Sequence, residues 1–307
     1  MIVAWNWQVH AILILGLFTI GTVVGSFLNV CIYRIPWEKS VVWPGSHCPR
    51  CMNAIAAQDN IPVISWIALR GECRQCGLRI SPRYPLIEFL VGMLFVAVYL
   101  CDIVFSKTIP WGALPIAIPV GLTYDLIFVA LLVTATFIDY DLFIIPDQIT
   151  VTGVIVGLGV GAIFPDIRPE PAHASTALGG LWVGILGLFV GAGLTQTVRV
   201  IGSIVFRKEA MGFGDVTLMA MIGAFLGWQV AVLTFFIAPF FGLAHSLGKV
   251  IAWLAKILTG KRISSLGEIP FGPYLSMAAL ALLLSWPWLW PGWAKENFDN
   301  LRMLFSW

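Results

Sequence analysis

The chain has 307 residues, of which 59% are hydrophobic and 11% are charged, and its mean hydropathy is +0.90. A soluble globular domain carries about 25% charged residues, so the composition excludes that class, and the hydrophobicity excludes a disordered chain. The 18 Lys and Arg residues nearly balance the 16 Asp and Glu residues, which excludes the basic surface that nucleic-acid binding needs. The composition indicates a helical protein that crosses the lipid bilayer several times.

Apolar stretches long enough to cross a bilayer occur along most of the chain, since a spanning helix needs about 20 apolar residues. They lie at residues 11–33, 85–105, 116–138, 148–164, 176–200, 229–255 and 271–290. A further stretch at 215–228 is shorter and is expected to turn back at Gly227–Gln229. The expected fold is therefore an all-α polytopic membrane protein with about eight transmembrane helices and a small zinc-binding cytoplasmic loop domain.

Charges in the loops predict the orientation of these spans. With eight spans and the N-terminus outside, every Lys and Arg falls on one side except Lys107, Arg168, Lys295 and Arg302. Short loops rich in Lys and Arg stay in the cytoplasm, so residues 34–84 are expected to form a cytoplasmic loop. The expected organisation is a first transmembrane helix at 1–33, which stays as an anchor, then the loop at 34–84 and a transmembrane region at 85–307.

Glycines recur at intervals that favour close packing of membrane helices. Small residues four positions apart let two helix backbones approach each other. The positions are Gly153, Gly157 and Gly161, then Gly180 with Gly184 and Gly187 with Gly191.

Four of the six cysteines form two C-x2-C pairs in the predicted cytoplasmic loop, with 21 residues between the pairs. They are Cys48 with Cys51 and Cys73 with Cys76. Two such pairs predict a structural zinc site, because each short turn lets two thiolates bind one tetrahedral ion. Metal binding would also supply folding energy to a polar loop that is too short for a good core. The alternatives are reduced structural thiols and, with less support, a redox pair.

The chemistry is expected elsewhere, among aspartates at the cytoplasmic ends of two spans. Asp139, Asp141 and Asp147 follow one span, and Asp215 begins a later one after two glycines. Acids in or beside a membrane are functional candidates, because a charge at the bilayer centre costs about 2.5–3.5 kcal/mol. A purely structural role stays open, since Asp147 and Asp215 are also placed to cap the helices that they begin.

Two aspartates on neighbouring helices can share one proton, since like charges about 3 Å apart cannot both ionise. The ionised acid then acts as general base on a water, and the protonated acid donates to the scissile carbonyl. The glycines beside Asp215 allow close approach of an extended peptide. This arrangement predicts an aspartyl protease. The sequence has no persuasive Ser-His-Asp set and no H-E-x-x-H motif for a zinc protease.

The ordered motifs resemble those of the bacterial prepilin peptidases, also called type IV leader peptidases, over nearly the whole chain. With the cysteine pairs between them, the motifs are Gly25–Pro36, Asn60–Trp66, Arg83–Glu88, Ile145–Asp147, Gly212–Asp215 and Ile269–Tyr274. A lone Gly-x-Gly-Asp would be a weak indication, whereas this ordered set is specific.

The resemblance implies a bifunctional enzyme of the bacterial inner membrane, with its active site facing the cytoplasm. Such enzymes cut the leader from prepilins and pseudopilins of type IV pili and type II secretion. In the family pattern the first catalytic acid lies seven residues before the proline of the Ile-Pro pair, which makes it Asp139, and Asp215 is the second. Asp141 and Asp147 become supporting candidates. Thr217 departs from the lysine expected there, which puts a substrate contact in doubt.

The resemblance also implies N-methylation of the new N-terminal residue with S-adenosylmethionine, and it associates the 34–84 loop with that activity. No Gly-rich strand–helix fingerprint supports a nucleotide-type domain. Asn29, Arg34 and Glu88 are polar residues at the ends of the first two spans that could contact the cofactor; interfacial anchoring is equally open. Two rival functions are another Gly-x-Gly-Asp intramembrane protease and a proton-coupled transporter.

Overall fold

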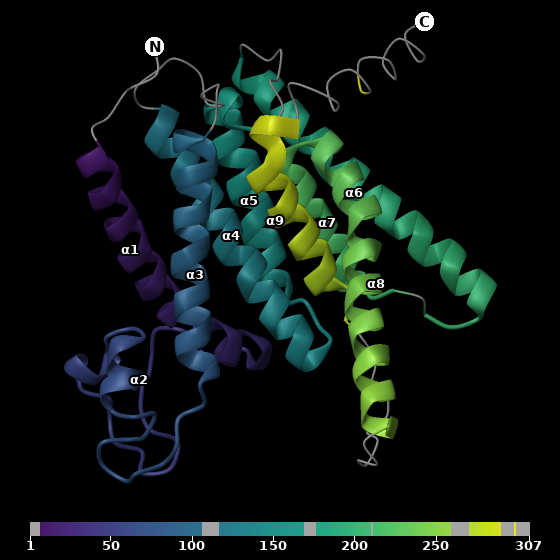
Figure 1. The fold of residues 1–307 in the computed structure, drawn as a ribbon. Helices are drawn as coiled ribbons and strands as arrows, with labels where there is room; N and C mark the ends of the chain where they lie inside the picture. Colours follow the sequence, from purple (N-terminus) through teal and green to yellow (C-terminus); the bar gives the residue numbers. More distant parts are fainter. Residues whose placement is uncertain are drawn as a thin grey trace, which may run out of the picture. The chain divides into compact units, whose positions relative to one another are not determined.

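The structure is a computed structural model that describes residues 7–105, 117–168, 176–209, 211–258 and 270–289, together with Phe298; within α8, side chains are described as far as Ile251. In chain order the elements are α1 (Trp7–Arg34), η1 (Ile35–Trp37), η2 (Ala57–Asn60), α2 (Ile64–Ala68), α3 (Arg83–Tyr99), the π-helical turn η3 (Leu100–Val104), α4 (Ala117–Leu142), α5 (Asp147–Ile163), η4 (Pro165–Ile167), α6 (Ala177–Phe206), α7 (Phe213–Leu226), α8 (Trp228–Leu258) and α9 (Gly272–Leu289) (Figure 1).

The all-α architecture predicted from the composition is confirmed across the described ranges, where no strand occurs beyond two isolated bridges. Among the described residues, six helical segments are long and apolar enough to cross a membrane. They correspond to α1, α3 with η3, α4, α6, α8 and α9. The two remaining predicted stretches form α5 and α7, which are shorter apolar helices. Gly227, with φ +87°, separates α7 from α8 where the turn was predicted.

The chain divides into two compact units, one of residues 1–105 with 125–134 and one of residues 106–124 with 135–307. In the first unit, α1 packs along α3. A methyl group added at Gly21 would lie 2.7 Å from the Cα of Gly92, and one at Gly25 would lie 2.7 Å from the Cα of Glu88. This pair of glycines, four residues apart, therefore lets the two backbones touch. The sequence alone did not predict this contact for Gly21 and Gly25.

In the second unit α7 is the central helix and contacts α5, α6, α8 and α9 (Figure 1). Side chains all around α7 are fully buried, among them Leu218, Met219, Ile222 and Phe225. A helix that is apolar on every face is expected in the middle of a bundle, because it has no polar side to give to solvent. The first turn of α7 is therefore held from several directions, and this turn carries Asp215.

The predicted glycine contacts between helices are confirmed, and they also enclose an arginine. Arg168 is 1% exposed and donates to the carbonyl oxygens of Gly157 and Gly161 in α5, Gly180 in α6 and Ala224 in α7. A methyl group at Gly161 would collide with the guanidinium. Counting Arg168 as a loop charge was therefore wrong, because the glycines leave room for its side chain inside the bundle.

Candidate functional site

Asp139 lies in the last turn of α4, where it is buried and fixed by a backbone amide from α9. Its side chain is 6% exposed, and its Oδ2 accepts a hydrogen bond of 3.0 Å from the backbone N–H of Gly272. Gly272 is the first residue of α9, so the positive end of an 18-residue helix faces this carboxylate. The helix terminus stabilises a negative charge on Asp139 and fixes the orientation of the carboxylate.

Asp215 occupies the third position of α7 and is 7% exposed. Its carboxylate accepts a hydrogen bond from the backbone N–H of Gly212, the N-cap residue. This contact is half of a capping box, so the structural role considered from the sequence is present. Capping alone does not require burial, however, because a capping acid on the surface would serve equally well.

The two buried carboxylates come together in space, although 76 positions separate them in the sequence. Asp139 and Asp215 lie close enough to interact electrostatically. Ile145 fills the space beside them, since its side chain packs against both Gly214 and Gly272. The ends of α4, α7 and α9 therefore meet at one point. Two adjacent acids in such a place can hold one proton between them and move it during a reaction.

The supporting aspartates lie outside this buried pair. Asp141 and Asp147 are exposed, whereas Asp139 and Asp215 are buried. The N-cap of α5 is Pro146, and Asp147 makes no side-chain cap, so the capping role considered for Asp147 was wrong. As an acid in the first turn, Asp147 still interacts favourably with the helix dipole. Thr217 donates to the carbonyl of Gly214 at 3.0 Å, which uses its hydroxyl within the helix.

An arginine that sequence reasoning missed holds the segment before α7. Arg199 of α6 donates from Nε to the carbonyl of Met211 at 3.1 Å and from Nη2 to Glu209 at 3.3 Å, and its guanidinium lies 5.8 Å from the ring centroid of Phe213. The contacts fix the chain on both sides of Gly212. Nothing in the sequence pattern distinguishes Arg199 from an ordinary loop cation.

The two cysteine pairs form matching turns, each closed by an isolated β-bridge. The bridges join His47 to Ala54 and Glu72 to Arg79. In each turn the residue four after the first cysteine donates its N–H to that cysteine's carbonyl, at 2.9 Å in both cases. That residue has a left-handed backbone in both turns, and it is Met52 in the first and Gly77 in the second. The same local fold thus occurs twice in the loop.

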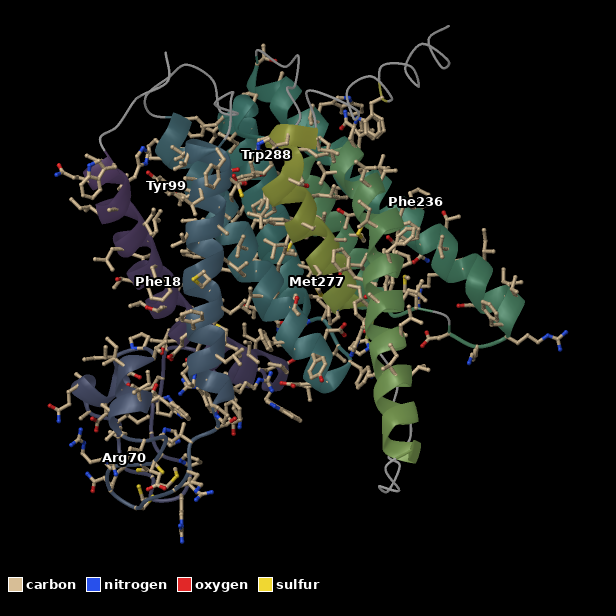
Figure 2. The ribbon with its side chains drawn as sticks, viewed as in Figure 1. Phe18, Arg70, Tyr99, Phe236, Met277 and Trp288 are labelled. Atoms are coloured by element: carbon tan, nitrogen blue, oxygen red, sulfur yellow. The ribbon has the colours of Figure 1, made fainter. Side chains whose placement is uncertain are left out.

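These turns bring the four thiols into one cluster, as Figure 2 shows by the sulfur atoms gathered in the loop that carries Arg70. The sulfur atoms of Cys48, Cys51, Cys73 and Cys76 all lie within 4.8 Å of one another, and those of Cys48 and Cys76 are 3.7 Å apart. Zinc–sulfur bonds of about 2.3 Å in a tetrahedral shell imply sulfur separations of about 3.8 Å. The cluster therefore fits a four-thiolate metal site.

Local electrostatics favour a thiolate at Cys48, whereas burial and the neighbouring thiols raise the pKa of Cys76 to about 11. Backbone N–H groups of Cys51 and Arg50 lower the pKa of the Cys48 thiol to about 6. Arg74, which lies between the second pair of cysteines, donates to both carboxylate oxygens of Asp59 in η2, at 2.8 and 2.6 Å. The Arg74 guanidinium lowers the pKa of Asp59, so the pair stays charged and ties the second turn to η2.

The three polar residues named for the cofactor have different surroundings. Asn29 donates to the carbonyl of Tyr84 at 3.2 Å, and Glu88 accepts from the backbone N–H of Val63 at 2.7 Å. Val63 has φ +60°, a strained conformation for a β-branched residue, and the buried Glu88 carboxylate holds it there. Only Arg34 among the three lines the cavity that the structure describes between α1 and the loop. The prediction of cofactor contact stays a prediction for Asn29 and Glu88.

Two further acids in the spans were missed from the sequence. Asp102 in η3 and Asp125 in α4 are buried and interact electrostatically with each other. One oxygen of each has no hydrogen-bond partner among the described residues. Single acids inside long apolar stretches are the signal that could have found them, because such residues are rare in membranes.

Comparisons with known proteins agree with this geometry. The sequence of residues 19–101 matches the family described as the bacterial peptidase A24 N-terminal domain. Residues 126–247 match the type IV leader peptidase family. The first range contains the four-cysteine cluster, and the second contains Asp139 and Asp215. No solved structure matches the chain.

Similar curated proteins extend over most of the chain. The prepilin leader peptidase/N-methyltransferase of Myxococcus xanthus is 36% identical over 285 residues, which cover 90% of this chain and 72% of that protein. The protein of the same name from Aeromonas salmonicida is 32% identical over 295 residues, which cover 87% of this chain and 89% of that protein. The type 4 prepilin-like proteins leader peptide-processing enzyme of Escherichia coli is 32% identical over 281 residues, which cover 86% of this chain and 90% of that protein. Because these similarities run through both the cysteine loop and the aspartate site, the chain belongs to the type IV leader peptidase family of membrane enzymes.

Proposed function

We propose that this chain cleaves the leader peptides of prepilins and pseudopilins with Asp139 and Asp215 as a catalytic dyad. The observation that carries the proposal is the meeting of these two buried carboxylates at the ends of α4 and α7. The names of the similar proteins specify the substrate class. The same names, together with the four-cysteine cluster, favour a prepilin peptidase over a transporter or another Gly-x-Gly-Asp protease.

The mechanism follows from the surroundings of the two acids. The ionised acid takes a proton from a water molecule, which attacks the scissile carbonyl, while the protonated acid donates to the carbonyl oxygen. The Gly272 N–H fixes Asp139, and the Gly212 N–H fixes Asp215, so neither acid has to reorient during the reaction. The absence of a side chain at Gly212 leaves the backbone before α7 open to an extended peptide, whereas Ile145 fills the space beside Gly214.

Replacement of either acid tests the dyad. Asp139→Asn and Asp215→Asn keep the size and the hydrogen-bonding capacity but cannot share a proton, so leader cleavage should fall by at least about 1,000-fold, as for an essential acid or base. The measurement is cleavage of a purified pilin precursor by full-length enzyme in detergent, scored by mass spectrometry. Asp125→Asn, a buried acid outside the site, is the matched control. Cleavage close to that of wild type by either dyad variant would refute the assignment.

The proposal places zinc in the cysteine cluster and the active site on the cytoplasmic side of the bacterial inner membrane. Cys48, Cys51, Cys73 and Cys76 would hold the ion, which closes both turns and leaves no open coordination position for catalysis. The proposed topology has eight membrane crossings, in which α5 and α7 join the six long segments. In that topology the 34–84 loop and the C-terminal end of α4 fall on the side rich in Lys and Arg, which is the cytoplasmic side.

The second proposed activity is methylation of the new N-terminal amine, since the similar proteins are named as N-methyltransferases as well as peptidases. When bound, S-adenosylmethionine would supply the methyl group for this transfer. The protein has to hold the amine unprotonated and in line, so its contribution is positioning. Arg34 is the predicted cofactor residue whose guanidinium lines a cavity.

A further inference from the structure

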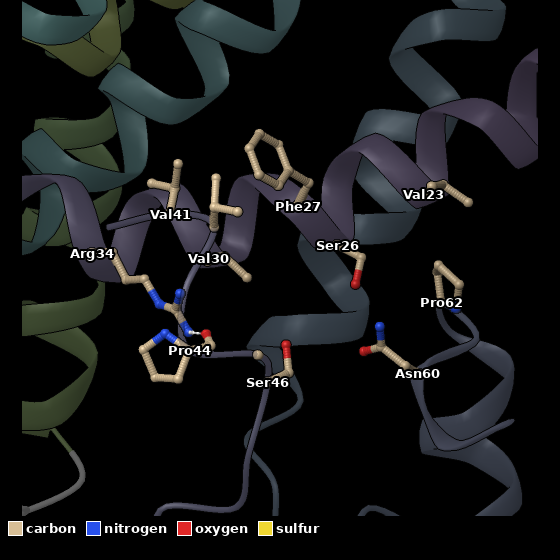
Figure 3. A pocket seen from close by; sticks show the side chains of 12 residues that line it. Val23, Ser26, Phe27, Val30, Arg34, Val41, Pro44, Ser46, Asn60 and Pro62 are labelled. Carbon is tan, nitrogen blue, oxygen red and sulfur yellow. Dashed lines mark hydrogen bonds between the residues drawn. The ribbon is translucent and has the colours of Figure 1, made fainter. Parts of the chain in front are cut away.

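A cavity of about 330 Å³ lies between the last turns of α1 and the loop that carries the cysteine pairs, inside the first compact unit. Figure 3 shows Ser26 and Arg34 on the α1 wall, with Ser46 and Asn60 on the loop opposite. Ligand sites have volumes of about 300–1,000 Å³. The cavity therefore has the size of a site for a small molecule or a lipid headgroup.

An apolar stripe on one side of α1 leads along the helix to this cavity and ends at a cation. The stripe consists of Val23, Phe27 and Val30, which line the cavity together with Arg34. The four residues follow one another at intervals of four, three and four positions, which places them on the same side of a helix. The glycines of α1 that touch α3 lie on the opposite side. The stripe is therefore free to contact an alkyl chain, and Val23 and Phe27 are about half exposed.

The length of α1 places Arg34 at the depth of the lipid headgroups. The helix has 28 residues and ends at Arg34. At 1.5 Å per residue it is about 42 Å long, whereas the hydrocarbon core of a bilayer is about 30 Å thick. Trp37 and Trp43, in the loop just after α1, are 62% and 78% exposed, and tryptophan is enriched in the headgroup layer. The cavity thus adjoins phospholipid headgroups.

The guanidinium of Arg34 is held in place and keeps donors for a ligand. It donates from Nη1 to the carbonyl of Ser40 at 2.9 Å and from Nη2 to the carbonyl of Pro44 at 2.7 Å. No carboxylate forms an ion pair with Arg34 within the parts of the chain that the structure describes. A guanidinium has five N–H donors, so three remain. Arg34 therefore presents one uncompensated positive charge, which matches the single negative charge of a phosphodiester.

The rest of the lining is neutral, and this selects among headgroups. Arg34 is the one charged residue among the described residues that line the cavity. The side chains of Ser26, Ser46 and Asn60 make no hydrogen bond to any described residue. An ethanolamine headgroup would bring an ammonium that no acid faces, and S-adenosylmethionine would bring an ammonium and a sulfonium. A glycerol headgroup brings two neutral hydroxyls instead, which the three polar side chains can bond.

We infer that this cavity binds one phospholipid of the phosphatidylglycerol type. Its phosphodiester lies on Arg34, its glycerol hydroxyls lie on the three neutral polar side chains, and an acyl chain follows the apolar stripe of α1. The lipid then joins the end of α1 to the loop, because Arg34 and Ser26 belong to the helix whereas Ser46 and Asn60 belong to the loop. The inference is independent of the proposed methylation, and the charges of the lining give S-adenosylmethionine no place in this cavity.

The experiment measures lipid binding to purified full-length protein by native mass spectrometry. Phosphatidylglycerol and phosphatidylethanolamine with the same acyl chains are titrated separately. The wild type should bind one phosphatidylglycerol per chain, at least about tenfold more tightly than phosphatidylethanolamine, since a charged hydrogen bond and an unpaired ammonium separate the two. Arg34→Gln should weaken phosphatidylglycerol binding by a similar factor and abolish the preference. Arg79→Gln, at an exposed cation of the same loop outside the cavity, is the matched control and should bind as the wild type does.

Two further variants leave the contacts of Arg34 with the loop intact. Ser26→Trp fills the cavity and should weaken phosphatidylglycerol binding at least about tenfold. Asn60→Ala removes one hydrogen-bonding group without adding volume and should weaken it about three- to tenfold. Leu15→Trp, on an exposed part of α1 outside the cavity, should have no effect. Metal content verifies that each variant keeps the fold of the cysteine loop.

Several outcomes would overturn the inference. Equal wild-type affinity for the two lipids, or an equal loss in Arg79→Gln and Arg34→Gln, would show unselective attraction to the protein surface. Wild-type affinity in both Ser26→Trp and Asn60→Ala would place the lipid elsewhere. Displacement of the lipid by an equal concentration of inorganic phosphate would identify a site for free phosphate. Loss of S-adenosylmethionine binding in Ser26→Trp, with lipid binding unchanged, would assign the cavity to methylation.

Discussion

The carboxylate of Asp139 occupies its position because residue 272 has no side chain. A methyl group built on Gly272 would lie 2.5 Å from Oδ2 of Asp139 and 2.9 Å from Cδ1 of Ile145. Both contacts are closer than van der Waals packing allows, so one of the neighbours would have to move. The carboxylate is the nearer of the two neighbours, so we expect the added methyl group to displace it and to affect cleavage more than folding.

Gly272→Ala should accordingly lower kcat for leader cleavage by about 100-fold, the usual effect of displacing a catalytic group by about 1 Å. The unfolding midpoint should change little, because an alanine is favourable at the start of a helix. Cleavage kinetics and thermal unfolding of the same preparation measure both effects. Gly159→Ala is the control, since a methyl group there would meet nothing within 4 Å. A wild-type kcat for the Gly272→Ala enzyme would show that this contact does not position Asp139.

At this scale the sequence predicted the acids but not their environment. Asp139 and Asp215 were identifiable because aspartates beside apolar stretches are rare and because Gly-x-Gly-Asp is a motif. The amide that holds Asp139 belongs to a residue 133 positions away, and no local pattern encodes so distant a contact. Arg199 was missed for the same reason, since its partner is a backbone carbonyl that every residue possesses.

Among the elements, the helices were predictable from hydropathy, whereas their contacts were not. The eight apolar stretches coincide with helices to within a few residues, because a long apolar segment can satisfy its backbone in lipid only as a helix. The cysteine spacing likewise predicted the cluster. The contacts of Gly21 and Gly25 depend on which helix lies opposite, and the sequence of α1 alone does not contain that information.

The cysteine turns are elements whose fold should depend on metal. Cys48→Ser removes one of four thiolates, so the protein should lose about one zinc per chain, and the loop should become sensitive to proteolysis. Metal analysis of the purified protein and limited trypsin digestion measure the two effects. Cys101→Ser, which replaces a cysteine outside the cluster, should change neither. A wild-type protein without bound metal would contradict the zinc assignment.

For the second compact unit as a whole, the buried Arg168 acts as a cross-link between three helices. Its hydrogen bonds reach carbonyls of α5, α6 and α7, the last at Ala224 near the end of α7 opposite to Asp215, so one side chain joins three helices of this unit. In the sequence Arg168 is one of 18 Lys and Arg residues, and nothing distinguishes it from the others. Its burial depends on the glycines that surround the guanidinium in the folded chain.

Arg168→Ala should therefore lower the free energy of unfolding by about 2–5 kcal/mol, because it leaves a cavity and removes charge-assisted hydrogen bonds. The free energy of unfolding of Arg168→Lys should lie between those of wild type and Arg168→Ala, since an ammonium lacks the planar guanidinium that reaches several carbonyls. Thermal unfolding in detergent, followed by intrinsic fluorescence, measures the loss. Arg79→Ala, at an exposed ion pair, should be neutral. Equal stability of Arg168→Ala and wild type would exclude the cross-link.

The contact between Asp139 and Gly272 also has a consequence for biosynthesis. Both acids leave the ribosome well before α9 does, yet the amide that orients Asp139 belongs to α9. A nascent chain should thus have no peptidase activity until α9 has inserted into the membrane. Leader cleavage can be measured for chains that end at residue 258, before and after a separately expressed α9 segment is added. Cleavage before the segment is added would rule out such a delay.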